Sequence, residues 1–191
     1  MNLDENYDLT GELLRIFKIP SPVLKKKSIA IDCINDDLKS LIKNMLYTMY
    51  QTPGIGLAAP QVGVSKRLFI IDINFTREKL TDSNGLHSYE YHDFCPRIFI
   101  NPVITKKEGT FLYEEGCLSI PGIYEEVKRS KKIELSYQDI NGNEKLLIAD
   151  EMLAVCIQHE LDHLDGIIFL DHLSLLKRQM IQKKFLKKKN K

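Results

Sequence analysis

The chain has 191 residues, 43% of them hydrophobic, and a formal net charge of +1. These values suit one folded domain with a buried core and exclude a chain that is disordered throughout. No stretch approaches the roughly 20 apolar residues of a membrane helix, and the acidic N-terminus lacks a secretory signal, so we expect a cytoplasmic protein without membrane contact.

The first predicted element is a helix over residues 38–49, whose apolar residues recur at helical spacing. Asn35 or Asp36 can cap its N-terminus, and Pro53-Gly54 can end it.

Several strands are predicted next. Residues 67–73 and 97–104 are apolar runs typical of buried strands. The polar residues 74–96 between them indicate a long loop. Residues 131–149 predict a hairpin around Asn141-Gly142, because this dipeptide favours a tight turn between strands.

Two helices complete the chain. Asp150 can cap the first, which Gly166 can end. Ser174 can cap the last helix, over residues 175–188, whose expected apolar stripe is Leu175, Leu176, Met180, Ile181 and Phe185. The order of elements predicts an α+β fold, with antiparallel strands packed around a central helix and a further helix at the C-terminus.

The charge is distributed unevenly. Residues 173–191 hold eight Lys or Arg and no acid, whereas the rest of the chain has 19 basic and 26 acidic residues. Such a tail favours a polyanionic partner, although a solvated helix end would look the same. We expect one domain over residues 1–191, with an extra segment at 1–13 and a helix with a basic tail at 174–191.

The stretch "QHELDH" (158–163) can form a metal site. Residues four apart lie one turn apart on the same face of a helix, so His159 and His163 can bind one ion. Glu160 is rotated away from them and is better placed to take a proton from water on the metal than to ligate. A surface helix with two histidines is the alternative, but this helix is apolar enough to be buried.

Two histidines do not complete a site, and the downstream residues offer poor third ligands. In proteases with a further histidine after a HExxH stretch, that position corresponds here to Phe169, and no glutamate follows Glu160. Asp165, Asp171 and His172 remain, but His172 lies beyond the glycine that ends the helix.

An upstream ligand is available in "EEGCLSIPG" (114–122). The four cysteines are widely spaced without a CxxC pair, and most free cysteines are buried apolar residues. Cys117, however, follows a predicted strand, and a thiolate is a good ligand for zinc or ferrous iron.

A third stretch, "GIGLAAPQVG" (54–63), combines small residues with Gln61. Small residues allow the backbone to approach another element or a substrate closely. The Gln61 amide could donate a hydrogen to a developing oxyanion. A packed turn with a surface glutamine is the alternative interpretation.

Together, "GIGLAAPQ", "EGCLS" and "QHELDH" resemble the three motifs of peptide deformylases, in the same order. The resemblance extends from about Ile16 to the final helix. It implies that Cys117, His159 and His163 are the metal ligands, with a fourth position left to water. The metal would be Fe2+, which Zn2+, Ni2+ or Co2+ can replace.

The implied reaction is hydrolysis of the formyl group from the N-formylmethionine of nascent polypeptides, with release of formate. Glu160 would act as general base and then acid, and the Gln61 amide and the Leu118 backbone N–H would stabilise the oxyanion. Residues at helical spacing before His159 lie on its face of the helix and can form a substrate pocket. An extended substrate can also pair, as an additional strand, with the backbone at the start of the stretch 54–63. The expected substrate-binding residues are Met152, Val155 and Cys156 for methionine and Ile55 and Gly56 for the backbone.

One position departs from the pattern, since Tyr124 stands where some members of the family have an arginine at the cleft mouth. The basic C-terminal helix resembles that of bacterial members that dock on the ribosome. Its lysines suit phosphate contacts without sequence-specific binding of nucleic acid.

Two other functions compete with this interpretation. One is a HExxH metallopeptidase, which the missing downstream ligand disfavours. The other is a non-catalytic metal-binding or ribosome-binding module, in which Glu160 and Gln61 would have no purpose.

Overall fold

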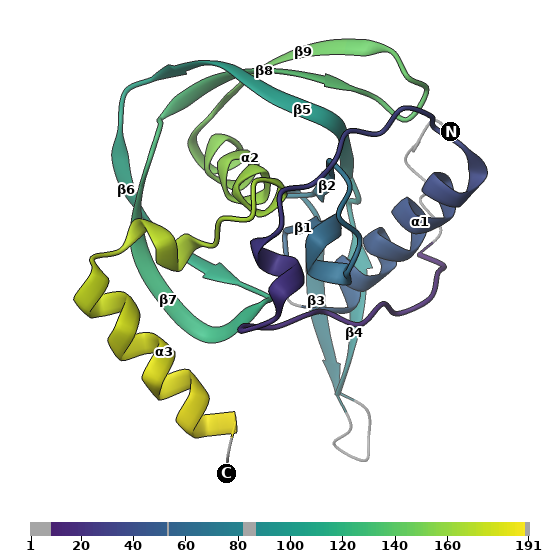
Figure 1. Cartoon of the computed structure of the whole chain (residues 1–191). Helices are drawn as coiled ribbons and strands as arrows, with labels where there is room; N and C mark the ends of the chain where they lie inside the picture. Colours follow the sequence, from purple (N-terminus) through teal and green to yellow (C-terminus); the bar gives the residue numbers. More distant parts are fainter. Residues whose placement is uncertain (1–8, 53, 82–86, 190–191) are drawn as a thin grey trace.

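The computed structural model describes residues 9–52, 54–81 and 87–189 and confirms the α+β class. Its largest sheet is antiparallel and curves around a central helix, α2 (Figure 1). The strand order is β1 (Gly56–Ala58), β2 (Leu68–Ile71), β5 (Arg97–Glu108), β8 (Lys132–Gln138) and β9 (Glu144–Asp150). A separate hairpin pairs β6 (Phe111–Cys117) with β7 (Ile120–Arg129).

The helices and short 3-10 turns connect these strands. They are η1 (Pro22–Lys25), α1 (Asp36–Gln51), η2 (Ala59–Val62), α2 (Glu151–Leu164), η3 (Phe169–His172) and α3 (Leu175–Lys189). No helix in the described ranges is long and apolar enough to cross a membrane.

The sheet lies between α1 and α2, which explains why strand β2 is apolar on both faces. Leu68 and Ile70 pack into the cluster formed with α1, whereas Phe69 and Ile71 pack into the cluster formed with α2. Successive side chains of a strand point to opposite faces, so burial on both sides requires a continuous apolar run. The predicted strand at 67–73 is therefore confirmed in its central four residues.

Helix α1 begins as predicted, and the cap is Asn35 rather than Asp36. The Asn35 side chain accepts a hydrogen bond from the Leu38 amide at 3.0 Å. The helix ends at Gln51, and Pro53, which was expected to help end it, lies outside the described residues.

Helix α2 carries the two histidines of the predicted metal site. It is confirmed over Glu151–Leu164, but the Asp150 side chain makes no capping hydrogen bond. Gly166 has φ +73°, and a Cβ there would lie 2.7 Å from the Lys25 carbonyl oxygen. A glycine is thus required both by the backbone conformation and by the close approach of the N-terminal segment.

The predicted loop at 74–96 is wrong, because this region contains two paired strands. β3 (Thr76–Thr81) and β4 (His87–His92) form an antiparallel hairpin that projects from the body (Figure 1). The six residues of β3 are all exposed, so the alternation that identifies a half-buried strand is absent. Edge-to-face contacts of Tyr50 with Phe75 and Phe94 anchor the base of the hairpin on α1.

The predicted hairpin at 131–149 is confirmed, as is the last helix with Ser174 at its start. The expected apolar stripe of α3 is only partly correct. Ile181 and Phe185 pack against the body, whereas Leu175, Leu176 and Met180 are more than half exposed. The helix projects from the domain (Figure 1), so only part of its apolar stripe packs against the body.

Candidate active site

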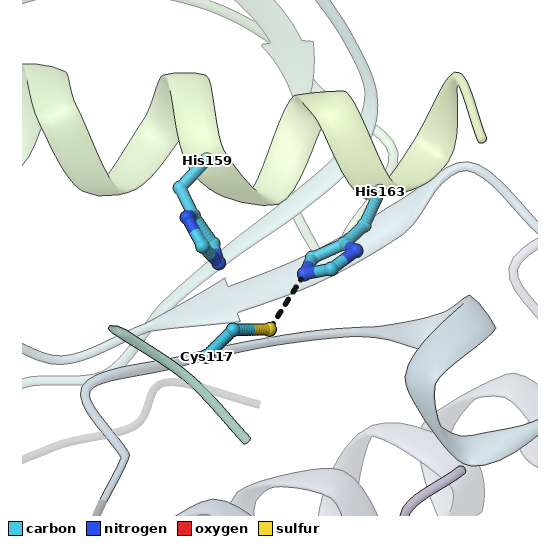
Figure 2. A group of neighbouring side chains, drawn as sticks. All are labelled: Cys117, His159 and His163. Atoms are coloured by element: carbon cyan, nitrogen blue, oxygen red, sulfur yellow. Dashed lines mark hydrogen bonds between the residues drawn. The ribbon is translucent and has the colours of Figure 1, made fainter. Parts of the chain in front are cut away.

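Cys117 meets His159 and His163 beneath α2. The two imidazoles lie one turn apart on the helix and point toward the last residue of β6 (Figure 2). The Cys117 Sγ lies 3.3 Å from His163 Nε2, and the ligand atoms of all three residues lie within 4.8 Å of one another. The structure therefore brings together the three residues proposed as ligands.

These three residues fit a divalent metal. Zinc lies about 2.3 Å from sulfur and about 2.0–2.1 Å from nitrogen, so tetrahedral geometry places these ligand atoms about 3.6 Å apart. The 3.3 Å between Cys117 Sγ and His163 Nε2 is close to this value. Three protein ligands would leave one position open, as in catalytic metal sites, whereas structural sites are usually closed by four.

The charge of the cluster also favours a cation. Burial alone would raise the pKa of the Cys117 thiol, but the positive charge of His163 and hydrogen bonds from both imidazoles lower it to about 5. The thiolate form of Cys117 is therefore favoured at neutral pH, beside two buried imidazoles. A divalent cation can stabilise this thiolate in place of protons on the two imidazoles.

Glu160 lies beside the histidines and is 5% exposed. Its Oε2 has no hydrogen-bond partner among the described residues, and burial raises the pKa of this carboxyl to about 7. A Cβ on Gly56 would lie 2.5 Å from Glu160 Oε1. Gly56 thus provides the space that the carboxyl group occupies, which the sequence pattern of small residues had indicated.

The Gln61 amide is held with its NH2 group toward the cluster. Its Oε1 accepts a hydrogen bond from the Ala58 amide at 2.8 Å. Its Nε2 lies 3.5 Å from Cys117 Sγ and 3.3 Å from Ser119 Oγ. Because the oxygen is engaged by the backbone, the side chain offers only donors to the site. Gln61 is 1% exposed, which excludes the alternative of a surface glutamine.

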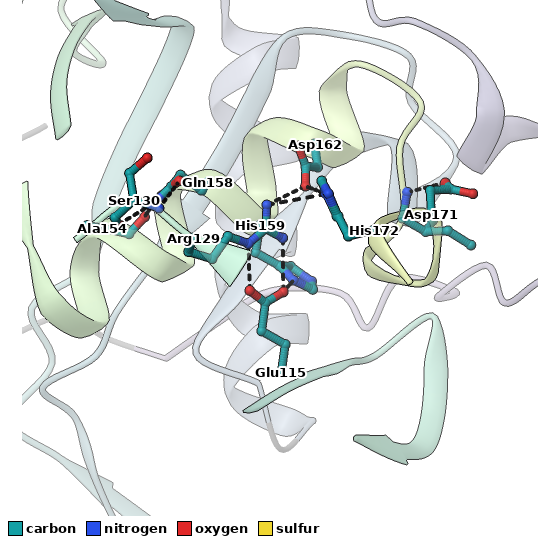
Figure 3. Close-up of polar contacts among 10 residues, drawn as sticks. Glu115, Arg129, Ser130, Ala154, Gln158, His159, Asp162, Asp171 and His172 are labelled. Atoms are coloured by element: carbon teal, nitrogen blue, oxygen red, sulfur yellow. Dashed lines mark hydrogen bonds and ion pairs between the residues drawn. The ribbon is translucent and has the colours of Figure 1, made fainter. Parts of the chain in front are cut away.

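A polar network behind the cluster, in which Glu115 and Arg129 are buried, orients His159 (Figure 3). Glu115 accepts a hydrogen bond from His159 Nδ1 at 2.8 Å, which leaves Nε2 for a metal. Arg129 in turn holds Glu115 through two hydrogen bonds of 2.6 and 2.9 Å and contacts Asp162 at 2.6 Å. His172 also contacts Asp162, at 2.6 Å.

Sequence reasoning missed this network. Glu115 and Asp162 stand inside the motifs quoted above, but nothing in the sequence indicates that Arg129, at the end of β7, would join them. Burial would raise the pKa of Glu115, yet the hydrogen bonds from Arg129 and His159 lower it, so this carboxylate stays charged. A charged Glu115 fixes the orientation of the His159 ring.

The other downstream ligand candidates are engaged elsewhere. Asp165 pairs with Arg67 at 2.8 Å, and Asp171 pairs with Lys25 and Arg178. His172 is bound to Asp162. Among the described residues, only the cysteine and the two helix histidines form a metal-ligand group.

A cleft of about 710 Å³ leads from the surface to this cluster. The structure places all the expected substrate-binding residues and Leu118, in the turn between β6 and β7, on its walls. Val155 and Cys156 are nearly buried, and Met152 lies nearer the surface and contacts the Tyr113 hydroxyl. Burial raises the pKa of the Cys156 thiol to about 12, so this part of the wall is neutral. Tyr124 is exposed at the cleft mouth.

Replacing Arg129 by methionine should lower the stability of the protein markedly. The change leaves the buried carboxylate of Glu115 and the partly buried one of Asp162 without this cation, which costs about 3–5 kcal/mol and lowers Tm by roughly 10 °C for a chain of this length. Thermal unfolding followed by circular dichroism measures the effect. The control Lys132→Met, at an exposed position, should leave Tm almost unchanged. An unchanged Tm in Arg129→Met would show that the network contributes nothing.

Comparisons with known proteins agree on one family. The sequence pattern of the family described as polypeptide deformylase matches residues 13–179. A peptide deformylase 2 of Xanthomonas axonopodis pv. citri is 45% identical over 180 residues, covering 93% of this chain and 96% of the relative. The peptide deformylase of Zymomonas mobilis is 46% identical over 178 residues, covering 93% and 95%.

Solved structures show the same likeness. The crystal structure of a peptide deformylase from Legionella pneumophila has a TM-score of 0.80 and 36% identity, covering 93% of this chain and 96% of that one. The peptide deformylase from Ehrlichia chaffeensis in complex with actinonin has a TM-score of 0.80 and 34% identity, covering 94% and 99%.

Proposed function

Since this chain belongs to the polypeptide deformylase family, we infer that it is a hydrolase that removes the formyl group from the N-formylmethionine of nascent polypeptides and releases formate. The observation that carries this function is the group of a thiolate and two imidazoles with ligand atoms within 4.8 Å, at the inner end of an accessible cleft. A non-catalytic metal-binding module would not need that cleft.

We propose that Cys117, His159 and His163 hold one divalent ion, with Fe2+ as the native metal and Zn2+, Ni2+ or Co2+ as substitutes. Thiolate and imidazole ligands suit each of these ions. When bound, the ion polarises the formyl carbonyl and lowers the pKa of a water molecule at the open position.

The other polar groups of the site divide the proton transfer and the charge stabilisation. Glu160 takes the proton of the attacking water and passes it to the leaving amine. The Gln61 amide and the Leu118 N–H stabilise the oxyanion that forms from the formyl oxygen. The fixed orientation of Gln61 supports this role, because donors that are already in place need no reorganisation during the reaction.

The cleft walls supply the binding of the substrate. Met152, Val155 and Cys156 lie on the face of α2 next to His159 and offer an apolar pocket for the methionine side chain. Gly56 belongs to β1, an edge strand of the sheet, so its free edge can pair with an extended substrate. The carbonyl of Ile55 already accepts a hydrogen bond from the Asp72 amide, so backbone pairing at this residue would use its N–H.

Formate release from a formyl-Met-Ala-Ser peptide tests this function. The protein should release formate from this peptide and should leave the peptide bonds of an unformylated Met-Ala-Ser intact. Cleavage of the unformylated peptide would instead indicate a HExxH metallopeptidase. A protein that binds metal but acts on neither peptide would be a non-catalytic module.

We also propose that the basic C-terminal helix associates with the ribosome, and hence that the protein acts in the cytoplasm, where nascent chains emerge. The lysines of residues 173–191 favour contacts with phosphate groups. The exposed Leu175, Leu176 and Met180 leave one face of α3 free for a partner.

Deleting residues 182–191 should weaken sedimentation of the protein with ribosomes while leaving turnover of formyl-Met-Ala-Ser unchanged. The deletion removes six of the eight basic residues of the tail, and ribosome binding should depend steeply on salt in the full chain. If the truncated protein sediments with ribosomes as the full chain does, the helix is not the binding element.

A further inference from the structure

A second cavity, of about 780 Å³, lies next to the substrate cleft. The N-terminal segment 15–21, the start of β7 and Phe185 of α3 line this cavity. In Figure 1, α3 lies at the edge of the molecule beside β7. None of the roles proposed above uses this cavity.

The two cavities share their walls. Ile16, Lys18 and residues 121–123 line both the cleft of about 710 Å³ and the second cavity. At Gly122, in the middle of this shared wall, an added Cβ would meet no atom within 4 Å. The space over Gly122 is therefore open, and the two cavities adjoin along this shared wall.

The second cavity has the chemistry of a site for peptide. Phe17, Ile123 and Phe185 are partly buried apolar residues packed on the cluster beneath it. Arg15 and Lys18 are exposed on its rim, and none of the described residues that line it is acidic. The guanidinium of Arg15 lies 5.0 Å from the centre of the Phe17 ring, which holds this cation over the cavity.

We propose that this second cavity binds the residues of the nascent polypeptide that follow its first three, and that it prefers apolar and acidic side chains there. The inference rests on the proposed function, because the adjoining cleft would hold the formylmethionine. A chain anchored at the metal ligands and extended through the cleft would then leave it over Gly122, where the two cavities adjoin. The apolar walls would then cover its side chains, and Arg15 and Lys18 would attract carboxylates.

Three formylated peptides test the proposal. An extended chain covers about 3.3 Å per residue, so formyl-Met-Ala-Ser reaches about 10 Å and an eight-residue peptide about 26 Å. The first peptide is formyl-Met-Ala-Ser. The second has eight residues and continues Met-Ala-Ser with Leu and Glu, and the third is the same eight-residue peptide with Lys in place of Glu. We expect the Leu and Glu peptide to have a kcat/KM about tenfold above that of the short peptide, as burial of one or two apolar side chains would give. The kcat/KM of the Lys peptide should be about three- to fivefold below that of the Leu and Glu peptide.

Two variants locate the effect, at residues that line only the second cavity. Arg15→Glu should abolish the difference between the Glu and Lys peptides, because the new carboxylate offsets the charge of Lys18, and Phe185→Ser should reduce the gain from length. Both should turn over formyl-Met-Ala-Ser as the unaltered protein does. The control Lys145→Glu, on the β8–β9 hairpin, should change none of the three values.

Equal kcat/KM for the short and long peptides would overturn the inference, as would a preference that Arg15→Glu leaves unchanged. Absence of formate release from formyl-Met-Ala-Ser would instead overturn the proposed function, so the two failures are distinguishable.

Discussion

Replacing Glu160 by alanine should lower kcat for formate release by a factor of about 10²–10⁴, the range for loss of a general acid–base group. The carboxyl group is buried next to the two histidines, and Oε2 has no hydrogen-bond partner in the described part of the chain, which supports the proposed role in proton transfer. KM for formyl-Met-Ala-Ser should change little, because the methionine pocket remains. Steady-state kinetics with metal analysis of the same preparation measures both.

The metal content distinguishes catalysis from simple damage to the site. Glu160→Ala should retain one equivalent of metal, since the three ligands are untouched. The control Glu126→Ala, an exposed carboxylate on β7, should have unaltered kinetics. Turnover by Glu160→Ala at the rate of the unaltered protein would contradict the proposed role.

Replacing Cys117 by alanine should remove both metal and activity. Loss of a residue that only orients a ligand typically costs 10- to 100-fold in metal affinity, so loss of a ligand should cost at least about 100-fold. The remaining imidazoles carry no negative charge to attract the cation. Metal affinity is measured by competition with a chromophoric chelator, independently of turnover.

The other cysteines provide a matched control. Cys33 is exposed, and Cys33→Ala should leave metal affinity and turnover unchanged. If Cys117→Ala kept both its metal and its activity, the upstream ligand would have to be abandoned.

Much of the site could be predicted because its chemistry is local in sequence. The spacing of His159 and His163 places them on one helix face without knowledge of the fold. The upstream ligand Cys117 needed a different argument, the absence of suitable downstream residues together with the resemblance to a family. Gly56 and Gln61 belong to one short stretch of small residues, so the sequence also indicated that both could contribute to the site.

The remaining features depend on contacts between distant segments. Arg129 meets Glu115 across the β6–β7 hairpin and Asp162 from α2, and no local pattern marks such a meeting. The β3 strand was missed because both of its faces are exposed, so it lacks alternation. The second cavity arises only when the N-terminal segment, β7 and α3 come together.

X-ray absorption spectroscopy of the zinc-loaded protein examines the coordination directly. The account predicts one sulfur at about 2.3 Å and two imidazole nitrogens at about 2.0–2.1 Å, with one lighter ligand from solvent. A spectrum without sulfur, or with four ligands from the protein, would contradict an open site built by Cys117, His159 and His163.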